Sequence, residues 1–96
     1  MSVYFIVQEK VLDEAMMEEY GKLAGPTLAG VNVKPLVVDN NVQSIEGEWH
    51  GSRVVVLEFD TEESFRGWYN SPGYQEAVKL RLAATDSRGI LAQGVE

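Results

Sequence analysis

Short runs of β-branched and aromatic residues alternate along this chain with segments in which apolar residues recur at helical spacing. Such runs are typical of β-strands. They predict strands at residues 3–8, 31–38, 53–59 and 89–95. Pro35 lies inside the second run and has no N–H to donate to a neighbouring strand, so we expect that strand at a sheet edge or at a bulge.

The first helical segment follows Asp13, a residue type that caps helix N-termini well. Its apolar residues recur with the helical period, at Met16, Tyr20, Leu23, Ala24, Thr27 and Leu28. Gly25-Pro26 interrupts this pattern and predicts a kink or a restart, because proline cannot bond back along the helix. Gly30 is the expected end of the helix.

The second helical region is divided in two by its own sequence. Thr61 is a good N-cap for a short helix, and three aromatic residues share one face of that helix, namely Phe65, Trp68 and Tyr69. Ser71-Pro72 is then typical of a new helix start, with proline at the first helical position. The segment that follows places one group of residues on a common face: Tyr74, Ala77, Val78, Arg81 and Leu82.

Asp39-Asn40-Asn41 predicts a turn after the second strand, and residues 42–47 could return as a short hairpin arm. The element order is therefore β-α-β-β-α-β, with an extra arm in the middle and a broken second helix. This order predicts a ferredoxin-like α+β sandwich, in which two helices cover one face of an antiparallel sheet. Residues 1–96 form a single domain in this interpretation.

The apolar runs also predict a partner. An antiparallel sheet with one face in water should alternate apolar and polar residues, whereas residues 3–7 and 54–57 are continuously apolar. Two helices can cover only one face of the sheet. We therefore expect a homodimer closed sheet against sheet.

Composition and charge narrow the classes of function. A formal charge of −7 argues against binding to nucleic acid, whose phosphates attract cationic surfaces, and against anionic membranes. No apolar run approaches the length that spans a membrane, and Met1 leads directly into the first strand without a signal peptide. The absence of cysteine excludes disulfides and thiolate chemistry and suits the cytoplasm.

Several residues together carry a resemblance to a known family. They are Glu46-Gly47, the strand from Arg53 to Glu58-Phe59, Trp68-Tyr69-x-Ser71-Pro72-x-Tyr74 and Arg81. In these positions, and over nearly the whole chain, the sequence resembles the DUF1330 domain, a family within the dimeric α/β-barrel superfamily. The resemblance implies a ferredoxin-like dimer, and it implies no particular reaction.

The chain offers few ligands for a metal or a cofactor. His50 is the one histidine, and between Trp49 and Gly51 it is expected to be an exposed loop residue. Zinc and non-haem iron sites need several histidine, cysteine or carboxylate ligands. We therefore expect no bound metal, haem or other cofactor.

A charged set and an aromatic set are the candidate site. Glu46, Arg53, Glu58 and Arg81 stand beside apolar strands, where they could form a salt-bridge network or an anion-binding patch. Trp68, Tyr69 and Tyr74 surround the helix break and could line a pocket or belong to the core. Two functions follow: a cofactor-free enzyme for small molecules, of the monooxygenase or isomerase kind by superfamily analogy, or a non-catalytic ligand-binding or structural dimer.

Overall fold

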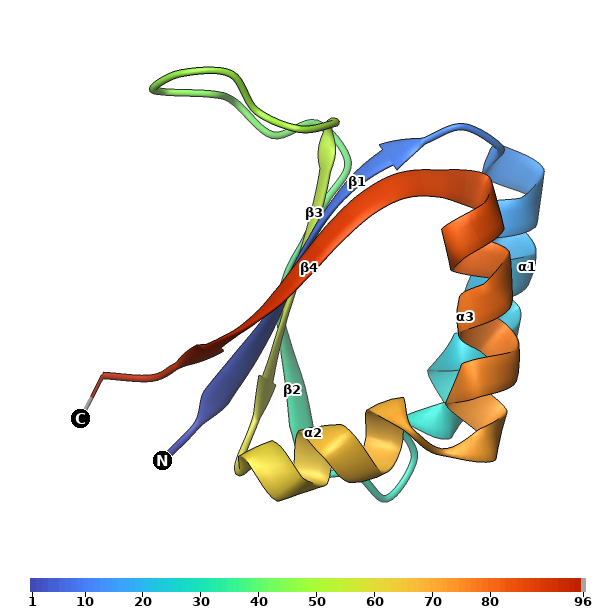
Figure 1. Ribbon diagram of the computed structural model, residues 1–96, viewed down its shortest axis with the longest axis vertical. Coiled ribbons are helices and arrows are strands. Elements are labelled where there is room, and N and C mark those ends of the chain that lie inside the picture. Colours follow the sequence, from blue (N-terminus) through green and yellow to red (C-terminus); the bar gives the residue numbers. More distant parts are fainter. Residues whose placement is uncertain (96) are drawn as a thin grey trace.

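The computed structural model describes residues 1–95 of the chain (Figure 1). The elements follow the predicted order, with the second helix divided in two: β1 (Val3–Val11), α1 (Glu14–Thr27), β2 (Val33–Asp39), β3 (Arg53–Phe59), α2 (Glu62–Tyr69), α3 (Pro72–Ala84) and β4 (Thr85–Gln93). Within this part of the chain, no helix is long and apolar enough to cross a membrane.

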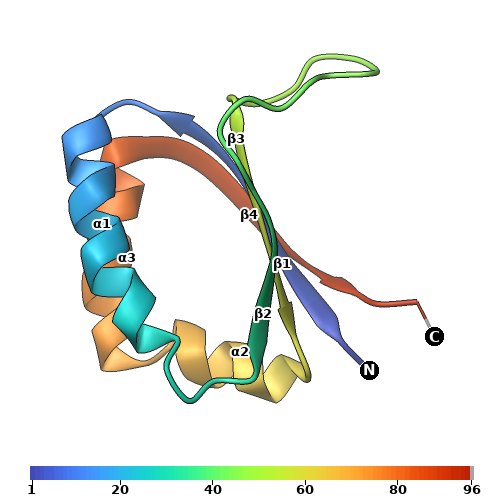
Figure 2. The same ribbon diagram turned by 180° about the vertical axis from the view of Figure 1, so that it is seen from behind.

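The four strands form one antiparallel sheet in the order β2-β3-β1-β4. The two strands at the centre are β1 and β3, so Val7 has Val55 on one side and Gly89 of β4 on the other. All three helices lie on the same side of the sheet, with α1 and α3 packed side by side (Figures 1 and 2). This is the ferredoxin-like α+β arrangement that the sequence predicts.

The helices begin where the capping residues predict. Asp13 accepts a hydrogen bond from the N–H of Met16 at 3.0 Å, and Thr61 accepts one from the N–H of Ser64 at 3.0 Å. Ser71 caps α3, with proline at its first position. The kink expected at Gly25-Pro26 is not a break, because α1 continues through Pro26 and ends one residue later at Thr27. The N–H that Pro26 lacks therefore falls in the last turn of the helix, and no further helical turn follows that it could disturb.

The core fills the space between the helices and the sheet. Strand alternation turns Val3, Phe5 and Val7 of β1 towards the helices, where they are buried. Aromatic rings from α2 and α3 pack over them, and the rings of Trp68 and Tyr74 have centroids 4.0 Å apart. The indole N–H of Trp68 donates to the Thr27 hydroxyl at 2.9 Å. The aromatic residues around the helix break therefore serve the core first.

Two strand predictions need correction. Residues 42–47 form no strand, and residues 40–52 are instead a long loop between β2 and β3, called here the β2–β3 loop. One backbone hydrogen bond, from Val42 N–H to Ser52 C=O at 3.1 Å, closes its base. The last strand begins at Thr85 rather than Gly89, because α3 passes into β4 without any loop. The bulge expected at Pro35 is present between Pro35 and Val37.

The sheet face opposite the helices is open in the single chain. Alternation places Tyr4, Ile6, Val56 and Ile90 on this face, and Ile90 is 59% exposed. The β2–β3 loop projects from the sheet towards the same side, away from the helices (Figures 1 and 2). Where β1 begins and β4 ends, the neighbouring residues of the two strands are joined, since Gly94 N–H donates to Ser2 C=O at 2.8 Å.

Candidate functional site

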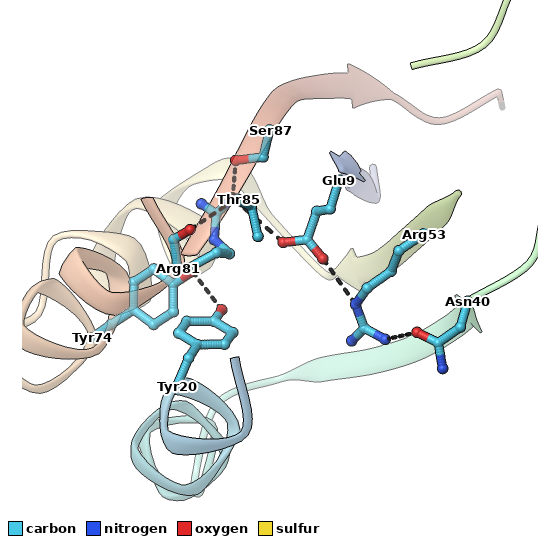
Figure 3. A network of polar contacts seen from close by, with 8 residues as sticks. All are labelled: Glu9, Tyr20, Asn40, Arg53, Tyr74, Arg81, Thr85 and Ser87. Carbon is cyan, nitrogen blue, oxygen red and sulfur yellow. Dashed lines mark hydrogen bonds and ion pairs between the residues drawn. The ribbon is translucent and has the colours of Figure 1, made fainter. Parts of the chain in front are cut away.

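Glu9 is the centre of the polar site. It continues the row formed by Val3, Phe5 and Val7 on the helix-facing side of β1, and only 2% of its surface is exposed. Its partner across the sheet is Arg53 of β3. The register brings Arg53 Nε to 2.8 Å from Glu9 Oε1, and a further guanidinium nitrogen of Arg53 donates to the side-chain oxygen of Asn40 (Figure 3).

Arg81 reaches the same carboxylate from the last turn of α3. Its Nη1 lies 3.7 Å from Glu9 Oε2 and donates to the Ser87 hydroxyl at 3.0 Å (Figure 3). The Arg81 backbone is held as well, since its carbonyl accepts a hydrogen bond from the Thr85 hydroxyl at 2.7 Å. Arg81 Nε is buried and has no hydrogen-bond partner among the described residues. One donor of a buried guanidinium thus lacks a well-aligned acceptor, although the Tyr74 side chain is close enough to the guanidinium for hydrogen bonding to contribute to its raised pKa.

Two tyrosines complete the group of polar side chains around Glu9 and Arg81. The hydroxyls of Tyr20 from α1 and Tyr74 from α3 lie 2.9 Å apart, within hydrogen-bond distance (Figure 3). Burial, together with the neighbouring Tyr74, raises the pKa of Tyr20 well above its ordinary value of 10.0. Tyr20 therefore stays protonated at neutral pH and acts as a neutral hydrogen-bonding group.

These groups surround one end of a cavity of about 220 Å³ between the helices and the sheet. Glu9, Arg81 and the two tyrosines form its polar end, and the remaining wall is mostly apolar, with Leu57 from β3 and Trp68 from α2. The wall is built from β1, β3 and all three helices. A mostly apolar hollow with a few convergent polar groups is the usual form of a small-molecule site.

A larger groove, of about 570 Å³, lies on the outer side of Arg53. Its charged lining residues are of both signs and include the exposed Lys10, Glu14 and Glu18. Arg53 lines both spaces. We take the smaller inner cavity as the site, because buried ionisable groups converge there and solvated charges need no ligand.

The polar end carries an excess of positive charge. Glu9 supplies one negative charge and faces two arginines, so the three side chains together carry a net charge of one positive unit. Burial alone would lower the pKa of Arg81, but Tyr74, Tyr20 and Glu9 outweigh that effect and raise it. Arg81 is therefore a permanent cation, which can only donate hydrogen bonds.

The structure brings some of the predicted site residues together and separates others. Arg53, Trp68, Tyr74 and Arg81 line the cavity, whereas Tyr69 packs in the aromatic cluster beside it. The expectation that Glu46 or Glu58 supplies the carboxylate of the network is wrong. Glu46 lies exposed in the β2–β3 loop, and Glu58 points to the open sheet face.

The register explains the position of Glu58. Glu58 pairs with Tyr4 across the sheet and accepts a hydrogen bond from its hydroxyl at 2.8 Å. This hydrogen bond is the largest cause of the raised pKa of the Tyr4 hydroxyl. Glu58 cannot reach Arg81, because a residue next to an inward-facing position on a strand faces the opposite side. Glu46 belongs to no strand and lies exposed in the loop.

His50 also differs from its expected exposure. It does lie in the β2–β3 loop, but its side chain is 14% exposed rather than free in solvent. Its Nε2 lies 2.8 Å from the backbone carbonyl oxygen of Asp86 in β4, so the ring fastens the loop to the sheet. Within residues 1–95 no three histidine, cysteine, aspartate or glutamate side chains gather as a metal site would require.

Two members of the site, Glu9 and Tyr20, were not singled out in the sequence as candidates. For Glu9 a signal is present, since it continues the inward-facing alternation of Val3, Phe5 and Val7 by one step. A charged residue in register with a buried row predicts a buried charge with partners. For Tyr20 the helical spacing indicates only a packed face, and nothing local distinguishes it from a core residue.

Fold and site together define a ferredoxin-like α+β protein with a polar-ended cavity between helices and sheet. The sequence matches the family model described as "Domain of unknown function (DUF1330)" over residues 2–95. The chain therefore belongs to the DUF1330 family. A search of curated proteins gave no match.

Solved structures share the fold. A protein of unknown function from Rhodopseudomonas palustris superposes with a TM-score of 0.84 at 21% identity, covering 99% of this chain and 83% of that one. SnoaB, a cofactor-independent oxygenase from Streptomyces nogalater, gives a TM-score of 0.69 at 18% identity and covers 99% and 94%. A dimeric protein of unknown function and ferredoxin-like fold from Bacteroides fragilis gives 0.68 at 17%, covering 97% and 96%. At these identities the likeness establishes the fold alone.

Proposed function

We propose that this protein is a cytoplasmic homodimer that binds a small organic molecule in the helix–sheet cavity and acts on it with its own side chains, without a cofactor. The observation that carries the proposal is the convergence of Glu9, Arg81, Tyr20 and Tyr74 at one end of an apolar cavity. A small domain has little stability to spare for buried ionisable groups. Their placement around open space therefore favours a use beyond packing.

The donors suit a reaction in which negative charge develops on oxygen. Removing a proton from carbon beside a carbonyl group leaves an enolate, and removing the hydroxyl proton of a phenol leaves a phenolate. In either case Glu9, the one carboxylate among the residues that line the cavity, would accept the proton, and donors placed in advance stabilise the anion. Arg81 is such a donor, and so is the tyrosine pair, in which one hydroxyl donates to the other and one O–H remains free. Isomerisation and cofactor-free oxygenation both pass through anions of this kind. The shared fold with SnoaB, a cofactor-independent oxygenase, supports including the second reaction.

The homodimer rests on the open sheet face. Ile6, Val56 and Ile90 form an apolar surface there without cover from the helices. A second copy placed sheet against sheet would cover it through an isologous interface. The description of the Bacteroides fragilis neighbour as dimeric supports this arrangement.

The alternative is a dimer without catalysis. The observation that favours it is the tight Glu9–Arg53 pair, at 2.8 Å, which joins two central strands and would be useful in any stable fold. In that case the cavity would bind a ligand without changing it, or it would be a packing defect without a function.

A ligand screen tests the proposal. Saturation-transfer NMR with small aromatic and carbonyl compounds should identify binders to the unmutated protein. Ala24→Phe fills the cavity from α1, because Ala24 is buried in its wall, and should abolish that binding. Ala83→Phe adds the same ring at an exposed position of α3 and should leave binding unchanged.

Turnover then separates the two functions. Bound compounds are incubated with the protein in air, with oxygen uptake and product mass as the measurements. New product that disappears in Ala24→Phe supports an enzyme, and binding without product supports the alternative. If Ala24→Phe and Ala83→Phe bind every compound as the unmutated protein does, the cavity is not the site and the proposal is wrong.

A further inference from the structure

We propose that the polar end of the cavity is an oxyanion site, which takes a monoanion consisting of a carboxylate, enolate or phenolate joined to one flat apolar ring. This inference rests on the proposed function and names the class of ligand for the same cavity. It depends on three features of the described residues: the charge balance, an open donor and the shape of the apolar wall.

The charge balance requires a negative partner. Arg81 is 5% exposed, and its one facing carboxylate, Glu9, is held more closely by Arg53, at 2.8 Å against 3.7 Å for Arg81. A buried charge with incomplete pairing is unfavourable. With a monoanion in the cavity, the net charge of the ligand, Glu9, Arg53 and Arg81 together would be zero.

The open donor shows where the anion would bind. Arg81 Nη1 already faces Ser87 and Glu9, whereas Nε is buried without a partner in the described chain. The N–H groups of a guanidinium lie in one plane and match the oxygens of a carboxylate. Because Arg81 lines the cavity, a ligand oxygen there would satisfy the unpaired donor. The hydroxyls of Tyr20 and Tyr74 stand beside it, and because one of them donates to the other, the pair offers one further O–H donor (Figure 3).

The apolar wall limits the rest of the ligand. Leu57, Trp68 and Ala24 line the space beyond the polar end. The cavity volume of about 220 Å³ lies below the usual range for drug-sized ligands, whereas an apolar cavity of about 150 Å³ is known to hold benzene. One substituted ring therefore fits, with its charged group towards Arg81.

Benzoate is the simplest probe of this class, and benzamide is its neutral counterpart of nearly equal shape. We expect benzoate to shift the amide NMR signals of cavity residues, with a dissociation constant of about 1 mM or tighter. Benzamide should bind at least about tenfold more weakly, because it brings no charge to the arginine. This comparison uses the unmutated protein, so it does not depend on the folding of any variant.

Arg81→Met keeps the bulk of the side chain and removes its charge and its donors, and should weaken benzoate binding at least about tenfold. Arg66→Met is the matched control, because Arg66 is an exposed residue of α2 that pairs with Glu62 on the surface. It should bind benzoate as the unmutated protein does.

The outcomes separate this inference from the proposed function. If benzamide binds as tightly as benzoate and Arg81→Met changes neither, the cavity is a ligand site but not an oxyanion site, and the inference alone is overturned. If benzoate causes no shift at about 10 mM, well above the expected dissociation constant, the inference also falls. The broader ligand screen then decides the proposed function independently.

Discussion

Arg81 and Glu9 meet across the interior, with Nη1 of the arginine 3.7 Å from Oε2 of the glutamate, although Arg53 holds that glutamate at 2.8 Å. The two arginines therefore depend on Glu9 differently. Removing Arg81 leaves the carboxylate paired with Arg53. Removing the charge of Glu9 leaves both arginines without their carboxylate.

This asymmetry predicts the order of two destabilisations. Glu9→Gln should lower the free energy of unfolding by about 3–5 kcal/mol, because it leaves the buried Arg81 and the partly buried Arg53 without their carboxylate. Arg81→Met should change it by less than about 1 kcal/mol, since it also removes a poorly paired buried charge. Urea unfolding at pH 7 measures both. A larger loss for Arg81→Met than for Glu9→Gln would contradict the pairing described.

The tyrosine pair predicts a loss of stability at high pH. The folded pKa of Tyr20 is raised above the ordinary value of 10.0, so above that pH the folded state holds a proton that the unfolded state has released. The contribution of protonated Tyr20 to the free energy of unfolding is complete below about pH 10. It falls as the pH rises further, by up to about 1.4 kcal/mol per pH unit. Tyr20→Phe should flatten this decline, as measured by urea unfolding at pH 7, 10 and 11. An equal decline in both proteins would exclude Tyr20 as the cause.

Two glycine substitutions should act in opposite directions. Gly51 has a φ of 75°, and a Cβ atom there would lie 2.3 Å from the backbone oxygen of Glu9. Gly51→Ala should therefore destabilise the protein by about 1–3 kcal/mol and displace the end of β1 that carries Glu9. Gly67 lies inside α2 with no heavy atom near the position of an added Cβ, so Gly67→Ala should stabilise by about 0.5–1 kcal/mol. Thermal unfolding of both variants checks the signs.

The open sheet face predicts the oligomeric state. Light scattering at micromolar concentration should give about twice the chain mass of 10.7 kDa. Ile6→Asp places a charge in the expected dry interface and should yield monomer or unfolded chain. Leu82→Asp makes the same change at an exposed position of α3 (58%) and should remain dimeric. A monomeric unmutated protein would refute the sheet-to-sheet dimer.

The order of the elements could be predicted because each depends on local signals. Thr61 and Ser71 begin helices through their own side chains, and Pro35 marks its bulge by lacking an N–H. The predicted arm at residues 42–47 failed because apolar residues alone do not make a strand without a neighbour to pair with. Inside this loop only Val42 finds a backbone partner near the base.

The site was harder to predict because its members meet through the sheet register. Arg81 is among the charged residues that the sequence predicts for a salt-bridge network or an anion-binding patch, but its carboxylate could be found only by knowing that Glu9 faces Arg53 and that α3 ends above both. The alternation along β1 shows that Glu9 faces inward. Only the three-dimensional arrangement shows which arginines it meets, and that a space remains beside them.

The contact between Ser2 and Gly94, at 2.8 Å, has a consequence for re-engineering the chain. Because the ends of β1 and β4 lie side by side, a short flexible linker could join them without disturbing either strand. New ends could be opened near Gly47 in the projecting β2–β3 loop, which leaves Asn40 and Gly51 at the loop base in place. Such a circularly permuted chain would begin with β3 and carry Arg53 close to its start, so that the cation would enter the fold before the carboxylate it binds.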